Sequence, residues 1–135
     1  MGLEQYTQKE CVRFDYSGKA KVIVIDTELW DYKYLNAGSY YCASLSKWEK
    51  LIVVTVKEYN GLIDYTVTGY GVERKRKIKR YMQELTWLLR KAKTAEDIEE
   101  LVKLYVYARK ALLHGRSSLT IMLNFKGEKL TLTLF

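Results

Sequence analysis

The sequence predicts one α+β domain over residues 1–135, in which an antiparallel helical hairpin packs on one face of a mainly antiparallel sheet of β-hairpins. Three observations predict this class: apolar-rich runs on both sides of Asn60-Gly61, a similar pattern at Lys126-Gly127, and two amphipathic segments between them, at about 72–93 and 95–114. The length suits one domain. Strands, then two helices, then further strands along the chain are typical of an α+β fold in which the helices form a layer on the sheet.

The clearest element is a hairpin of the runs 51–59 and 62–70, because Asn60-Gly61 favours a type I′ turn of two residues. A turn of this length fixes the register. The predicted cross-strand pairs are Lys57 with Asp64, Thr55 with Thr66, Val56 with Tyr65, and Val54 with Val67. All four are favourable pairs, so the register is consistent with the side chains that it brings together.

The last strands repeat this pattern around a turn at Lys126-Gly127. One face then pairs Leu123 with Leu130, Ile121 with Leu132, and Leu119 with Leu134. The other face pairs Thr120 with Thr133 and Met122 with Thr131. We therefore expect this hairpin to cover a core with its aliphatic face and to expose the other face to water.

A third hairpin is expected to join residues 11–16 to 20–26 around Ser17-Gly18-Lys19. A three-residue loop there would pair Asp15 with Lys21 and Phe14 with Val22. The following segment, 27–49, is dense in Trp and Tyr and has a turn signal at Asn36-Ala37-Gly38. It is expected to form a fourth, irregular hairpin, whose aromatic side chains either form an interface or pack in the core.

The two helical segments differ in the width of their apolar faces. In 72–93 one stripe carries Ile78, Tyr81, Met82, Leu85, Leu88, Leu89 and Ala92. The second helix has a capping-box-like start at Thr94 and Asp97, and Gly115 is the expected C′ residue. Its apolar arc is wider, so we expect it to be sandwiched between layers or covered by a partner.

The net positive charge of the chain lies on the first helix. The chain has 23 basic and 16 acidic residues, a net charge of +7. Segment 72–93 has the same surplus, because only Glu73 and Glu84 oppose its basic residues: Arg74, Lys75, Arg76, Lys77, Lys79, Arg80, Arg90, Lys91 and Lys93. Cations in the first turns oppose the helix dipole and repel each other, so helix stability does not favour them there. Side chains and free N–H groups at this end of the helix together suit phosphate.

A tryptophan lies on the same outward side of this helix. Trp87 shares the side opposite the apolar stripe with Arg76, Arg80 and Lys91. An outward Trp among cations can stack on an exposed base while the cations hold phosphates. The sequence therefore predicts non-enzymatic binding of nucleic acid, with single strands favoured, through Arg74, Lys75, Arg76, Lys77, Lys79, Arg80, Trp87 and Lys91. The alternative is a solvated helix face, with Trp87 packed under a loop or a second subunit.

A weaker, enzymatic alternative comes from the strand that ends in Asp26-Thr27-Glu28, where two carboxylates are two residues apart. This stretch resembles the first motif of the DEDD family of 3′–5′ exonucleases. The resemblance implies that Asp26 and Glu28 would hold two Mg²⁺ ions for phosphodiester hydrolysis. The family also needs a later acidic residue beside a Tyr or His, for which Tyr59 and Asp64 are the best candidates, although they flank a turn rather than lie on a helix.

In its few Asn and Gln residues and its abundant Lys, Glu, Tyr and Val, the chain resembles short proteins encoded by viruses of hyperthermophilic archaea. This resemblance implies an intracellular location. No apolar run reaches the length of a membrane span, and the start lacks the pattern of a secretory signal, so we expect a cytoplasmic protein.

For the remaining candidate residues, a structural role is preferred to a catalytic one. His114 is the only histidine and is expected to cap the second helix, and Arg109 is expected to form an interface ion pair or to extend its head to water. The sequence leaves open whether Cys11 and Cys42 are bonded. No cofactor, metal site or membrane partner is expected. A homodimer is the structural alternative, because hairpins leave sheet edges that need cover.

Overall fold

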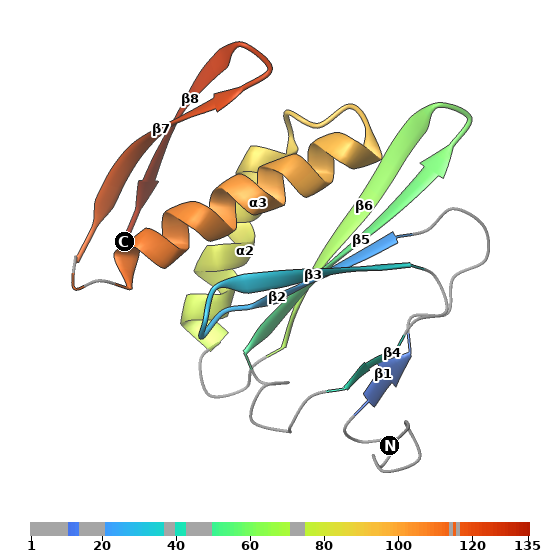
Figure 1. Ribbon diagram of the computed structural model, residues 1–135, viewed down its shortest axis with the longest axis horizontal. Helices are drawn as coiled ribbons and strands as arrows, with labels where there is room; N and C mark the ends of the chain where they lie inside the picture. Colours follow the sequence, from blue (N-terminus) through green and yellow to red (C-terminus); the bar gives the residue numbers. More distant parts are fainter. Residues whose placement is uncertain are drawn as a thin grey trace.

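The structure is a computed structural model that describes residues 11–13, 21–36, 40–42, 50–70, 75–113, 115 and 117–135. Its elements are β1 (Cys11–Arg13), β2 (Lys21–Asp26), β3 (Asp31–Asn36), β4 (Tyr40–Cys42), β5 (Leu51–Tyr59), β6 (Leu62–Tyr70), α2 (Lys75–Leu89), α3 (Ala95–Leu112), β7 (Leu119–Phe125) and β8 (Glu128–Leu134). Figure 1 shows α3 between the large sheet and the hairpin of β7 and β8. The fold is α+β, as predicted.

The central sheet has four antiparallel strands in the order β3-β2-β5-β6. β5 and β6 meet at Asn60-Gly61, where both residues have the positive φ of a type I′ turn. The register sets Lys57 opposite Asp64 and Thr55 opposite Thr66, which confirms the sequence prediction. Because β6 is last in this order, it is an edge strand within the described part of the chain.

The C-terminal hairpin forms as predicted but makes a sheet of its own. β7 and β8 pair with each other, with Leu123 opposite Leu130 and Ile121 opposite Leu132. Their aliphatic face packs on α3, and Thr120 and Thr133 are exposed on the other face. Lys126 and Gly127 form the turn with positive φ. The hairpin therefore completes the core from the side opposite the central sheet.

The predicted third hairpin is wrong. β2 pairs with β3 on one side and β5 on the other, whereas β1 pairs with β4; residues 14–20 lie outside the described part. Asp26 causes the difference, because its carboxylate accepts hydrogen bonds from the main-chain N–H groups of Glu28 (2.8 Å) and Leu29 (3.1 Å). These bonds stabilise a tight turn, in which Trp30 has a φ of 55°, and return the chain along β2.

The aromatic segment is divided between two sheets instead of forming a hairpin by itself. β3 lies beside β2, with Tyr34 opposite Ile23, and β4 lies beside β1. The register of β1 and β4 sets Cys11 opposite Cys42. Directly opposed Cα atoms are about 4.5–5.5 Å apart, within the range of a disulfide, so the backbone allows the bond that the sequence left open.

The two helices are joined by a capped turn. α2 ends at Leu89, earlier than predicted, because the N–H groups of Lys91 and Ala92 bond carbonyls three residues back and close the helix. Thr94 is the N-cap of α3 and forms the predicted capping box with Asp97. Glu58 at the end of β5 accepts a hydrogen bond from Ala95 N (3.3 Å). α3 ends at Leu112 with Leu113 as its C-cap, so it is shorter than predicted, and Gly115, with a φ of +89°, lies one residue beyond the C′ position that the sequence predicted for it. That position belongs to His114, which lies outside the described residues.

The core has α3 at its centre. Ile98, Leu101, Val102 and Tyr105 are fully buried in one cluster with β2 and β5 on one side and β7 and β8 on the other. The wide apolar arc of α3 is therefore covered by layers of this chain, which was one of the two predicted outcomes. No helix in the described ranges has both the length and the apolarity to cross a membrane.

A glycine brings α2 onto the edge of the sheet. A Cβ atom added at Gly69 of β6 would lie 2.6 Å from Met82 Sδ and closer still to Ile78 Cγ2. Only a residue without a side chain fits there. α2 therefore lies against β6, whereas α3 lies over β3 and β5.

Candidate functional site

The outer face of α2 gathers cations that have no acidic partner among the described residues. Arg76, Lys77 and Lys79 are exposed and Arg80 is half-buried. Within the described part of the chain, none of these four takes part in an ion pair, whereas Lys50 pairs with Glu28, Lys110 with Asp31, and Lys126 with Asp97. The charge of α2 is therefore directed to solvent, as the sequence predicted.

Arg80 has an unsatisfied hydrogen-bond donor. Its guanidinium carbon lies 5.7 Å from the centre of the Tyr81 ring, and its Nε atom is buried without a hydrogen-bond partner in the described part of the chain. A buried donor on a charged group costs free energy when it lacks an acceptor. Because this Nε atom is buried, it is not accessible to an anion in solution, and Arg80 contributes to the outer face of α2 through its charge.

The acidic residue of α2 points the other way. Glu84 lies against α3, where its Oε1 atom accepts hydrogen bonds from Arg109 Nη2 and from the Tyr105 hydroxyl (2.7 Å). Burial raises the pKa of the Tyr105 phenol, so it stays protonated and donates to Glu84. Burial alone would lower the pKa of Arg109, but Tyr105 and Glu84 outweigh it and raise the pKa. Glu84 is therefore neutralised inside the fold.

Arg109 is thus a buried residue, neither at an interface nor extended to water. Only 4% of it is exposed, and its guanidinium lies 4.5 Å from the centre of the Tyr81 ring. It also donates to the main-chain oxygen of Phe135 (3.0 Å). Trp30 packs edge-on against Tyr81 and Tyr105, which closes the cluster. This cluster fixes the rotation of α2 and hence the direction of its outer face.

A groove runs along one flank of α2. It has a volume of about 420 Å³ and is lined by Lys79, Met82, Gln83, Thr86, Trp87 and Arg90. Trp87 is 44% exposed, which confirms that it points away from the core. Lys79 and Arg90 lie at the two ends, about 16 Å apart along the axis at 1.5 Å per residue. An aromatic surface is thus flanked by two cations in one open groove.

Several predicted site residues lie elsewhere. Lys91 follows the end of α2 and pairs with Glu128 of β8 (3.1 Å), so it faces the C-terminal hairpin and does not line the groove. Arg74 lies outside the described residues, and for Lys75 only the main chain is described. Sequence reasoning had omitted Arg90 from the site, although its position three residues after Trp87 puts both on one side of a helix.

The carboxylates of the nuclease alternative do not converge. Asp26 is largely buried and caps the turn after β2, and Glu28 pairs with Lys50 (3.0 Å). Asp26 is opposite Leu51, at the far end of β5 from Lys57, which is opposite Asp64. Six residues of strand separate these positions, about 20 Å. Among the described residues no three metal-ligating side chains gather at one point, and this arrangement gives no support to a nuclease.

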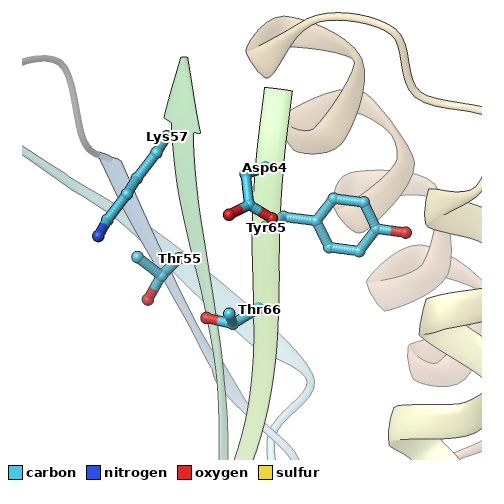
Figure 2. Close-up of a pocket in the computed structure, with 5 residues that line it drawn as sticks. All are labelled: Thr55, Lys57, Asp64, Tyr65 and Thr66. Atoms are coloured by element: carbon cyan, nitrogen blue, oxygen red, sulfur yellow. The ribbon is translucent and has the colours of Figure 1, made fainter. Parts of the chain in front are cut away.

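A second, smaller pocket lies on the hairpin of β5 and β6. It has a volume of about 110 Å³ and is lined by Thr55, Lys57, Asp64, Tyr65 and Thr66. Figure 2 shows Lys57 and Thr55 directed to one side of the hairpin, whereas the Tyr65 ring extends to the other side, toward the helices. The side chains around it are those of cross-strand pairs, with Lys57 opposite Asp64, so this pocket is a feature of the hairpin surface.

The groove of α2 is therefore the place where the predicted chemistry comes together: an exposed aromatic ring, and cations that pair with no acidic residue in the described ranges. No protein-family model, curated protein or solved structure matches the chain.

Proposed function

We propose that the protein binds single-stranded nucleic acid through the groove of α2, without catalysing a reaction. The observation that carries this proposal is the exposed Trp87 between Lys79 and Arg90. A base that stacks on Trp87 gains contact with an aromatic face, and the flanking cations hold the phosphates on each side of it.

The proposed roles divide between affinity and strand preference. Lys79, Arg90, Arg76 and Arg80 contribute the electrostatic part, which depends on salt and is independent of sequence. Trp87 contributes stacking, which needs an accessible base face and so favours unpaired strands over duplex. Gln83 and Thr86 are the neutral polar residues in the groove, and their small number fits binding with little base selectivity.

The first experiment measures affinity for a fluorescent oligothymidylate by anisotropy over a series of salt concentrations. For wild type we expect log Kobs to fall linearly with log salt. Replacing Lys79 and Arg90 together by Gln removes two phosphate contacts, so the slope should decrease by about 1.4. The control replaces exposed Lys33 and Lys103 by Gln, which removes the same charge from β3 and α3 and should leave the slope nearly unchanged.

The second experiment tests the tryptophan. Trp87→Ala should weaken binding to the single strand by roughly 5- to 150-fold, corresponding to about 1–3 kcal/mol of stacking, while Trp87→Phe retains part of it. A duplex of the same length should lose much less. No binding by wild type at low salt, or equal losses on single strand and duplex, would count against the proposal.

A further inference from the structure

β6 is a strand whose cover is incomplete. It is nine residues long and forms the edge of the central sheet within the described part of the chain. Its apolar side chains Ile63, Tyr65 and Val67 face the helices but are only half-buried, whereas Val54 and Val56, opposite Val67 and Tyr65 on β5, are buried. These side chains of β6 therefore leave apolar surface exposed beside the open edge of the strand.

The edge also has main-chain hydrogen-bonding groups that no described strand pairs with, in a regular order. In a hairpin with a two-residue turn, the residues that flank the turn exchange hydrogen bonds, so Leu62 and every second residue after it bond to β5. The N–H and C=O groups of Ile63, Tyr65, Val67 and Gly69 then point to the open edge. β6 contains no Lys or Pro, and its register with β5 has no bulge. It thus lacks three of the features that keep an edge from pairing, and Asp64 is the only charged residue along it.

We propose that β6 pairs antiparallel with β6 of a second copy of this chain, about a two-fold axis at Thr66. In this register Tyr65 is opposite the partner's Val67, and Ile63 is opposite the partner's Gly69. Their outward N–H and C=O groups form the inter-strand hydrogen bonds. Aromatic and β-branched residues make favourable cross-strand pairs, and Asp64 is opposite the partner's Thr68, so no like charges meet. Two copies form one continuous sheet, and the same surface serves both.

This dimer places the grooves of α2 beside its axis. Tyr81 and Glu84 face α3, so the flank that carries Lys79, Thr86 and Arg90 is the one turned away from α3. Met82 joins that flank to the sheet, because it lines the groove and lies against Gly69 of β6. The two-fold axis therefore brings the second α2 alongside the open flank of the first, on the same face of the joined sheet.

The ligand of this shared cleft rests on the proposed function. Two rows of cations, none of them in an ion pair with a described residue, repel each other, and a polyanion between them removes that repulsion. Nucleic acid should therefore strengthen the dimer, and dimerisation should strengthen binding by the same factor, because the two equilibria are linked.

The test measures molar mass by sedimentation equilibrium for wild type, Thr66→Lys, Thr66→Glu, and an equal mixture of the two variants, with and without oligothymidylate. Thr66 is exposed, so a charged side chain there is tolerated in the single chain. In the dimer the two Thr66 Cα atoms are about 4.5 Å apart, so like charges oppose pairing. We expect a dimer for wild type, monomers for each variant, and a dimer for the mixture.

The control is Thr133→Lys, which adds the same charge to the exposed face of β8 and should leave the dimer intact. A wild type that stays monomeric with and without oligonucleotide, or a Thr66→Lys variant that still dimerises, overturns the proposed dimer. The monomeric Thr66→Lys variant should bind oligothymidylate at least tenfold more weakly than wild type, yet measurably, through its single groove. A dimer that responds to these substitutions but binds no oligonucleotide overturns the proposed function alone.

Discussion

Glu84 of α2 and Arg109 of α3 form a buried ion pair that neutralises the acidic residue of the basic helix. The Tyr105 hydroxyl and the main-chain oxygen of Phe135 complete the hydrogen bonds around it. The pair therefore has two effects: it joins α2 to α3, and it turns the acidic side chain of α2 away from the cations of the outer face.

Removing one partner of this pair should destabilise the protein strongly. Arg109→Met leaves Glu84 among apolar and aromatic groups without its cation, and we expect a loss of about 3–5 kcal/mol in the free energy of unfolding. The measurement is urea denaturation followed by circular dichroism. The double variant Glu84→Gln, Arg109→Met should lose less free energy of unfolding than Arg109→Met alone. A loss below about 1 kcal/mol for Arg109→Met would contradict a role of the ion pair in holding α2 on α3.

The turn between α2 and α3 should depend on pH through Asp97. Burial alone would raise the pKa of Asp97, but Lys126 and the N–H groups of Lys93 and Thr94 outweigh it and lower the pKa below its ordinary 3.8. The unfolded chain thus binds the proton more tightly, so the contribution of Asp97 is complete above about pH 5 and is lost as pH falls through the lowered pKa.

Asp97→Asn should accordingly reduce the free energy of unfolding by about 1–2 kcal/mol at neutral pH and make little difference at about pH 2. Urea denaturation at a series of pH values tests this expectation. Glu128→Gln is the control, because Glu128 belongs to an exposed pair with Lys91. A difference between wild type and Asp97→Asn that is constant over the whole pH range would contradict the interpretation.

The contact of α2 with β6 should be sensitive to one methyl group. Gly69→Ala puts a Cβ atom into Ile78 and Met82, so α2 must shift, and we expect a loss of about 1–3 kcal/mol. Because Met82 also lines the groove, oligonucleotide affinity should fall as well. The neighbouring Thr68→Ala, at an exposed position, is the comparison. Equal stability of these two variants would show that the close approach is absent.

Local signals determined how much of this fold could be predicted. The turns at Asn60-Gly61 and Lys126-Gly127 each fix a register, and all the predicted pairs of both hairpins are present. The capping box at Thr94 likewise marks the start of α3. The pairing of β2 was missed because its turn contains no Gly or Pro and depends on the side chain of Asp26, which had suggested a metal ligand.

The candidate site shows the same limit. The helical wheel placed Trp87 and Arg76 on the outer face correctly, since that depends only on the period of the helix. It also placed Lys91 there, but the helix ends before Lys91, whose partner comes from β8, far along the chain. The inward orientation of Glu84 depends on Arg109 of α3 in the same way. Contacts between distant segments were beyond the reach of periodicity.

The turn function of Asp26 makes a prediction that separates it from metal binding. Asp26→Asn keeps a side-chain oxygen that can accept from Glu28 N and Leu29 N, so stability should change little, whereas Asp26→Ala should lose about 1–2 kcal/mol. Thermal denaturation with Mg²⁺ and with EDTA should give the same midpoint for wild type. A midpoint that rises with Mg²⁺ and falls in Asp26→Asn would restore the metal site.

The most direct test of the groove is photo-crosslinking to a single-stranded oligonucleotide that contains 5-iodouracil, followed by mass spectrometry of the crosslinked peptide. A base stacked on an aromatic ring is well placed to crosslink to it, so the account predicts a principal crosslink at Trp87. This crosslink should disappear in Trp87→Ala and weaken when Lys79 and Arg90 are replaced by Gln. A principal crosslink on the hairpin of β5 and β6, or an unchanged yield in Trp87→Ala, would contradict the proposal that α2 binds the strand.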